Sequence, residues 1–146
     1  MTVGDLIGSR SEVYSIRDDM TVHEAARYLR DRKIRSVGVL DAQGRLVGVV
    51  SQSDISDKVA AENKCPAWMH VGEIMSTRLV TVGAGQPLDE CLRLMEQHGI
   101  YHLPALGPDG AYRGMLSVTD LLSVIASDEK ARADMLEAFV FERRSV

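Results

Sequence analysis

An internal repeat is the feature that most constrains the fold of this chain. The stretch GVVSQSD at residues 48–54 returns as GMLSVTD at residues 114–120, an offset of 66 residues. The same offset pairs Ile34 with Ile100. Self-similarity at a fixed spacing indicates that one supersecondary unit occurs twice, so the fold has to be built from two similar halves.

Composition limits what these halves can be. A chain of 146 residues with 45% hydrophobic and 26% charged residues can form one sizeable core or two smaller ones. The net charge of −4 provides no basic surface for nucleic acid, and no apolar run is long enough to span a membrane. The two cysteines, Cys65 and Cys91, do not suggest a disulfide framework. We therefore expect a cytoplasmic protein with no nucleic acid or membrane partner.

Apolar and turn residues follow the same order in both halves. Thr21 and Glu24 predict a capping box, in which the threonine hydroxyl caps a helix and Glu24 binds the Thr21 amide. Pro104 predicts that its strand lies at a sheet edge. A short strand precedes the helix of each half, and a short helix follows each Ser-x-x-Asp, so the unit is β-α-β-β-α and the fold class is α/β (α+β). The two hairpins are expected as strands 36–40 with 46–50, and 102–106 with 112–116.

The repeat also predicts the domain organisation. Repeat 1 takes residues 1–62, a linker takes 63–70, repeat 2 takes 71–126 and a tail takes 127–146. We expect the tail to be an amphipathic helix that packs on its own chain or on a second copy. Its apolar face is formed by Met135, Leu136, Phe139 and Val140.

These features together resemble a tandem pair of cystathionine-β-synthase (CBS) domains, the Bateman module, of the small stand-alone bacterial type. The resemblance covers about residues 3–126 and rests on the β-α-β-β-α order, the repeat, Leu103-Pro104-Ala105 within a strand, and Gly-x-x-Ser-x-x-Asp in both copies. It implies that the two repeats pack about a pseudo-two-fold axis and leave two clefts for adenosyl nucleotides such as AMP, ATP or NAD. AMP is the expected ligand.

The resemblance further implies a non-catalytic sensor. Nucleotide occupancy would be transmitted to a regulated partner that the sequence does not name, and the chain would form a homodimer. The ligand would be the adenosyl nucleotide itself, with no required cofactor and no metal. No Ser/His/Asp or Cys/His set that could serve an enzyme is apparent in the sequence.

Site residues follow from the resemblance position by position. In the family, the motif aspartate accepts hydrogen bonds from the ribose hydroxyls, while hydroxyl and basic residues face the phosphate. The first cleft would use Asp54, Ser51, Ser53, Arg35, Ser36 and Val49, with Ser76, Thr77 and Thr81 from the other repeat. The second would use Asp120, Ser117, Thr119, Tyr101, His102 and Met115, with Ser9 and Ser15 from the first repeat. Ser53 and Thr119 stand where many members carry arginine, so the expected phosphate contacts are few.

Two alternatives stay open at this point. Ser-x-x-Asp is also an ordinary helix-start signal, with serine as the N-cap and the acid in the first turn. A carboxylate is nevertheless an acceptor only, which suits two neighbouring ribose hydroxyls. The runner-up function is a structural dimerisation or protein-interaction module without a physiological ligand.

Overall fold

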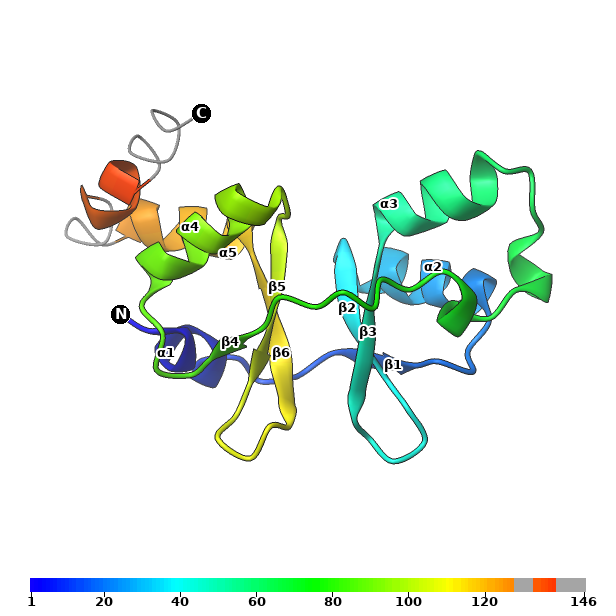
Figure 1. The fold of residues 1–146 in the computed structure, drawn as a ribbon, viewed down its shortest axis with the longest axis horizontal. Helices are drawn as coiled ribbons and strands as arrows, with labels where there is room; N and C mark the ends of the chain where they lie inside the picture. The colour runs from blue at the N-terminus through cyan, green and yellow to red at the C-terminus, as the bar shows by residue number, and fades with distance from the viewer. Residues whose placement is uncertain (128–132, 139–146) are drawn as a thin grey trace. The chain divides into compact units, whose positions relative to one another are not determined.

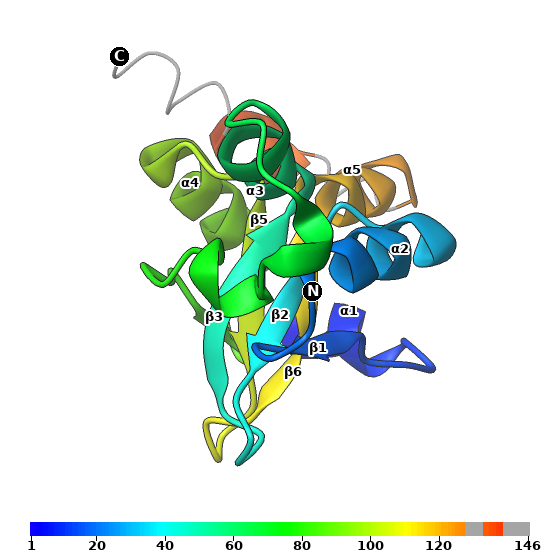
Figure 2. The same cartoon turned by 90° about the vertical axis from the view of Figure 1, so that its right-hand side faces the viewer.

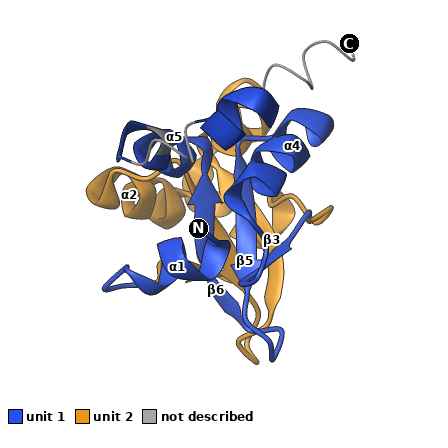
Figure 3. Ribbon diagram, turned by 90° about the vertical axis from the view of Figure 1, so that its left-hand side faces the viewer, with its two compact units in different colours: residues 1–12, 80–146 blue, residues 13–79 orange. Residues whose placement is uncertain are grey.

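A computed structural model describes residues 1–127 and 133–138, and within them the chain has a mixed α/β fold with two three-stranded sheets. The expected fold class is confirmed. The chain forms two compact units, drawn in separate colours in Figure 3. Unit 1 combines residues 1–12 with the chain from residue 80 onward, and unit 2 takes residues 13–79. Within the described residues, no helix has the length and apolar character needed to cross a membrane.

The two sheets have the same topology. In unit 2, β1 (Ser15–Arg17) runs parallel to β2 (Ser36–Leu40), which pairs antiparallel with β3 (Leu46–Ser51). In unit 1, β4 (Val82–Gly83), β5 (His102–Leu106) and β6 (Tyr112–Ser117) repeat this order. The register shifts between Val39 and Leu40, and again 66 residues later between Ala105 and Leu106. The sequence repeat is therefore a structural repeat down to this irregularity.

One long helix of each unit precedes its hairpin. These helices are α2 (Val22–Arg32) and α4 (Leu88–His98), and both end in a left-handed residue, Lys33 and Gly99. The Thr21 hydroxyl caps α2 by accepting from the Glu24 amide at 3.1 Å. The expected bond from the Thr21 amide to Glu24 is wrong, because the Glu24 carboxylate accepts from the Thr21 hydroxyl instead, at 2.9 Å.

Shorter helices complete the two units. In unit 2, α3 (Gln52–Ile55) runs into the π-helical turn η1 (Ser56–Ala60), followed by the 3₁₀ turns η2 (Pro66–Trp68) and η3 (Val71–Glu73). Unit 1 contains α1 (Val3–Gly8) and α5 (Val118–Ser127). Figures 1 and 2 show that α2 and α3 lie on one face of the β1–β2–β3 sheet. Each unit buries its own apolar cluster between its sheet and its helices.

The strand that contains Pro104 is not an edge strand, so that expectation is wrong. It is β5, which lies between β4 and β6. Strand β4 is only two residues long and pairs with Ala105 and Leu106. Pro104 pairs antiparallel with Met115 of β6 and lies just before the paired segment of β4. The missing amide of proline therefore costs no bond to β4, which allows proline in a central strand.

The tail folds back onto unit 1 through a different face from the one expected. Residues 133–138 are helical, and Met135 belongs to the buried cluster of unit 1 with 1% of its surface exposed. Its buried neighbour on the helix is Ala138, three residues on, whereas Leu136 is 51% exposed. The inclusion of Leu136 in the apolar face is therefore wrong. Phe139 and Val140 lie outside the described residues.

This packing makes Met135 a stability determinant. Met135→Ala should lower the free energy of unfolding by about 2–5 kcal/mol, because it leaves a cavity in the core of unit 1. Leu136→Ala is the matched control and should change it by less than about 0.5 kcal/mol. Urea denaturation followed by circular dichroism measures both values. Equal effects of the two substitutions would show that the tail does not pack as described.

Candidate functional site

The carboxylate of Asp120 caps the start of α5. Its Oδ2 atom accepts the backbone N–H of Ser117 at 2.8 Å, and the Asp120 amide donates to the Ser117 hydroxyl at 3.1 Å. This reciprocal pair satisfies amides that have no partner within the helix. The helix-start role that the motif allowed is therefore present, and it fixes the carboxylate where strand β6 ends.

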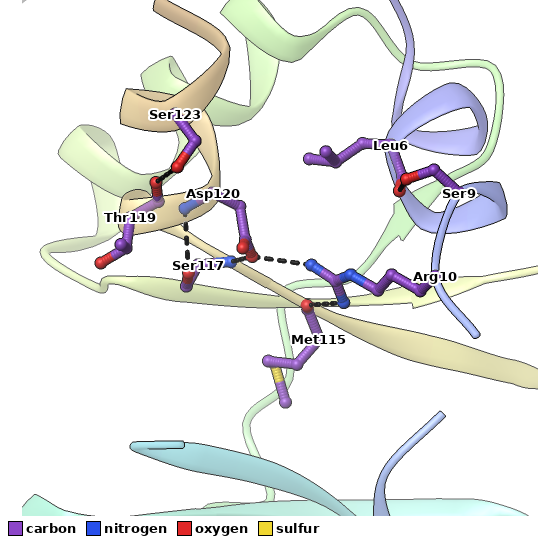
Figure 4. Close-up of polar contacts among 8 residues, drawn as sticks. All are labelled: Leu6, Ser9, Arg10, Met115, Ser117, Thr119, Asp120 and Ser123. Atoms are coloured by element: carbon purple, nitrogen blue, oxygen red, sulfur yellow. Dashed lines mark hydrogen bonds and ion pairs between the residues drawn. The ribbon is translucent and has the colours of Figure 1, made fainter. Parts of the chain in front are cut away.

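A cation from the N-terminal segment contacts the same carboxylate. Arg10 donates from Nη2 to Oδ2 of Asp120 at 2.8 Å and from Nη1 to the carbonyl oxygen of Met115 at 2.6 Å (Figure 4). The side chains of Arg10 and Asp120 are 28% and 32% exposed. The guanidinium thus joins the end of β6 to the first turn of α5.

Helix α1 holds Arg10 at this place. The amides of Val3 and Gly4 donate to the carbonyl oxygens of Gln86 and Ala84 at 2.9 and 2.8 Å, which fixes the helix within unit 1. The Thr2 hydroxyl caps α1 together with Asp5, and the Thr2 amide that binds this carboxylate lowers the pKa of Asp5.

Strand β6 gives α1 and Arg10 room at Gly114. Gly114 has a φ of 137°, a backbone conformation that L side chains rarely adopt. A Cβ atom there would lie 3.4 Å from Nη1 of Arg10 and 3.6 Å from Ile7. Glycine therefore serves both the backbone conformation and the close approach of α1.

Asp54 has the corresponding place in unit 2. Its Oδ2 accepts the backbone N–H of Ser51 at 2.9 Å and the Ser51 hydroxyl at 3.2 Å. Its Oδ1 forms an ion pair with Lys58 at 3.0 Å, and Lys58 also donates to the carbonyl oxygen of Ile74 at 2.8 Å. The Asp54 side chain is only 12% exposed.

The two aspartates differ in their remaining capacity for a ligand. An ionised carboxylate offers about four acceptor positions. Asp54 uses both oxygens within the chain, whereas among the described residues Oδ1 of Asp120 accepts no hydrogen bond. Asp120 is also the more exposed of the two. Its site therefore has more room for further donors.

Most residues expected at the first cleft fall in unit 2 beside Asp54. Val49 and Ser76 form a bridge through two backbone bonds of 3.0 and 2.8 Å, so the segment after η3 does reach β3. Ser36 is buried, and within the described part of the chain its hydroxyl has no hydrogen-bond partner. The expected residues of unit 2 that lie exposed are Arg35, Ser53, Ser76 and Thr77.

Most residues expected at the second cleft fall in unit 1 beside Asp120. Ser9 follows α1 and donates from its hydroxyl to the Leu6 carbonyl oxygen at 2.7 Å (Figure 4). Thr119 and Tyr101 are exposed, and His102 is half-buried at the start of β5. One expected residue of each cleft belongs to the other unit, Thr81 to unit 1 and Ser15 to unit 2. The ligand-binding roles of all these residues stay predictions.

The sequence analysis missed the two cations at the aspartates. Lys58 follows Asp54 by four residues, a spacing that predicts an ion pair on a helix. Arg10 is 110 residues from Asp120 in the chain, so no local spacing could indicate the pair. The one available signal was its neighbour Ser9, which the resemblance already assigned to the Asp120 cleft.

Groups for covalent or metal chemistry are sparse near these aspartates. Within residues 1–127 and 133–138, no three side chains of His, Cys, Asp or Glu are grouped to hold a metal ion. Burial, followed by the nearby acids Glu90 and Asp89, raises the pKa of Cys91 to about 12, so its thiol stays protonated at neutral pH. The arrangement is suited to hydrogen bonding and charge pairing.

The capping bonds predict that both aspartates support stability. Asp54→Ala and Asp120→Ala should each lower the free energy of unfolding by about 1–3 kcal/mol, because a helix-start amide loses its charged acceptor. Asp57→Ala, an exposed acid of η1, is the control and should stay within about 0.5 kcal/mol. Chemical denaturation provides the comparison. An effect of Asp120→Ala no larger than that of the control would contradict the capping role.

Known proteins are similar to this chain in sequence and in fold. Inosine-5′-monophosphate dehydrogenase of Nitrosopumilus maritimus is 29% identical over 108 residues, 74% of this chain and 21% of that enzyme. The magnesium transporter MgtE of Thermus thermophilus is 31% identical over 122 residues, 80% of this chain and 26% of the transporter. The chain thus spans about a quarter or less of the length of these two relatives.

Solved structures match most of the chain. A protein with CBS domains from Burkholderia ambifaria MC40-6 aligns with a TM-score of 0.81 and 26% identity over 88% of this chain and 96% of that one. The CBS domain pair of protein MJ0100, in complex with 5′-methylthioadenosine and S-adenosyl-L-methionine, aligns with a TM-score of 0.77 and 23% identity over 87% and 97%. The family model for the CBS domain matches residues 3–61 and 71–127. The chain therefore belongs to the CBS domain family, as a tandem pair of CBS domains.

Proposed function

We propose that this CBS pair is a non-catalytic regulatory module that binds an adenosyl ligand at its motif aspartates. The observation that supports this most strongly is the repeated carboxylate at the end of β3 and of β6, held in both units by a serine amide. Such a carboxylate is an acceptor that is held in position before any ligand binds, and two vicinal ribose hydroxyls are matching donors. The related fold of MJ0100 in complex with two adenosyl compounds supports the same ligand class.

The Asp120 site is the stronger candidate of the two. We use this name for Asp120, Ser117, Met115 and Arg10, which contact one another at the junction of β6 and α5. Oδ1 of Asp120 accepts no bond from the described residues, and the side chain is more exposed than that of Asp54. A ribose therefore needs to displace fewer internal contacts here than at Asp54.

The relatives support a regulatory rather than a catalytic role. A dehydrogenase and a magnesium transporter have unrelated activities, yet each contains a stretch similar to this chain. A shared stretch that makes up 21% of one protein and 26% of the other is a poor candidate for either activity. We infer that it acts instead as a sensor, here as a homodimer that signals to a partner protein.

Regulation by a ligand requires two states with different affinity for it. A ligand that binds one arrangement of the chain better shifts the population toward that arrangement, and a partner protein can recognise the change. AMP is the ligand that we propose first, because its ribose suits the carboxylate and its phosphate suits a nearby cation.

Loss of charge at both aspartates should abolish adenosyl binding. The double substitution Asp54→Asn/Asp120→Asn keeps an acceptor oxygen for the serine amides, so it separates ligand binding from helix capping better than alanine does. Each substitution removes hydrogen bonds to a charged acceptor, worth about 1.5–3 kcal/mol. Isothermal titration calorimetry with AMP measures the loss, and circular dichroism confirms that the variant is folded.

A thermal-shift series provides the control. A ligand that binds only the native state raises the melting temperature, so AMP should stabilise the unmodified protein and leave the double variant unchanged. Asp57→Asn carries the same charge change on an exposed acid and should keep the AMP response. A protein that no adenosyl compound stabilises would instead be a structural dimerisation or docking module.

A further inference from the structure

Arg10 neutralises the carboxylate that the proposed function assigns to the ribose. Its two terminal nitrogens bind Asp120 Oδ2 and the Met115 carbonyl oxygen at 2.8 and 2.6 Å (Figure 4). Both bonds are made within unit 1, by a residue that follows directly from helix α1 and Ser9. The pair is partly buried, so water screens it less than an exposed ion pair.

The backbone of Arg10 is fixed, whereas its side chain is free to change rotamer. Helix α1 is bound to the chain at Ala84 and Gln86, and the Arg10 amide donates to the Ile7 carbonyl oxygen at 3.1 Å. The Arg10 side chain is 28% exposed, and a long side chain on a fixed backbone can change rotamer without unfolding the helix. Arg10 can therefore leave Asp120 and still remain beside the site.

Neutral and anionic ligands would interact differently with the Arg10 guanidinium. A neutral nucleoside can place one hydroxyl on Oδ1 of Asp120, but its second hydroxyl has to share Oδ2 with a charge-assisted bond that is stronger than a hydroxyl bond. A ligand with an anionic group gives the guanidinium a new partner, and the planar fork of arginine suits a phosphate. The released carboxylate then accepts both ribose hydroxyls. When Arg10 leaves Asp120, it therefore regains an ion pair only if the ligand carries an anionic group.

We propose that Arg10 determines ligand selectivity at the Asp120 site, by moving from Asp120 to an anionic group on the ligand. The preferred ligands are adenosyl compounds with such a group, and neutral adenosyl compounds bind more weakly. This inference rests on the proposed function and supplies a phosphate partner for a motif that carries Thr119 directly before its aspartate. No other described residue forms an ion pair with Asp120.

The test compares AMP with 5′-methylthioadenosine, which has the same nucleoside but an uncharged 5′ substituent. Both ligands are titrated calorimetrically into the Asp54→Asn protein, so that the Asp120 site dominates the signal. The affinity ratio of AMP to methylthioadenosine should fall about tenfold or more in Asp54→Asn/Arg10→Ala, the change expected for the loss of one charge-assisted bond. Methylthioadenosine itself should bind Arg10→Ala as well as or better than the parent.

Two further variants separate charge from structure. Arg10→Gln keeps a donor for the Met115 carbonyl and the Asp120 carboxylate but has no charge, so its affinity ratio should fall as in Arg10→Ala. Arg113→Ala removes an arginine from β6, the strand that contains Met115. Arg113 pairs with the exposed Asp109 at 3.1 Å. It should leave the ratio unchanged.

The outcomes are distinct. If both ligands bind and the ratio is the same with and without Arg10, the selectivity role is wrong while the proposed function stands. A ratio that also falls in Arg113→Ala reflects general charge and overturns the assignment to Arg10. If neither ligand binds the unmodified protein, the proposed function fails and this inference fails with it.

Discussion

The bond from a serine amide to the motif carboxylate is the interaction on which the rest of the structure depends. In each unit it joins the last residue of the hairpin to the first turn of a helix, through Ser51 and Asp54 or Ser117 and Asp120. Without it the serine amide would lose its charged acceptor, and the start of the helix would be held to the end of the hairpin by one bond fewer. The same bond holds a charged acceptor at a defined place, which is the basis of the proposed ligand site.

Both units contain this bond from a serine amide to a carboxylate, but a different cationic side chain pairs with the carboxylate in each unit. Asp54 pairs with Lys58, four residues further along the same helical run, and is nearly buried. Asp120 pairs with Arg10, which follows α1 and Ser9 and lies far away in the sequence. A lysine is a point charge, while arginine offers a planar fork, so equal motifs need not have equal ligand preferences. The two CBS domains are therefore one structural unit used twice, with a different cation at each motif aspartate.

The repeat made the fold predictable, because strands, turns and helix starts recur at one offset. The pattern in each half therefore supports the structure predicted for the other. Local signals failed where tertiary context decided. Pro104 lies in a central strand because β4 is too short to need its amide, and Leu136 is exposed because the tail packs through Met135 and Ala138. The motif aspartates could be named from sequence, but Arg10 could not, since its partner is 110 residues away.

A crystal structure of the protein with AMP tests the central claim most directly. The account predicts that the ribose hydroxyls bind the Asp120 carboxylate and that the Arg10 guanidinium has left Oδ2 for the phosphate, while the Ser117 amide keeps its bond to Asp120. AMP bound with its ribose away from Asp120, or with Arg10 still paired to that carboxylate, would contradict it.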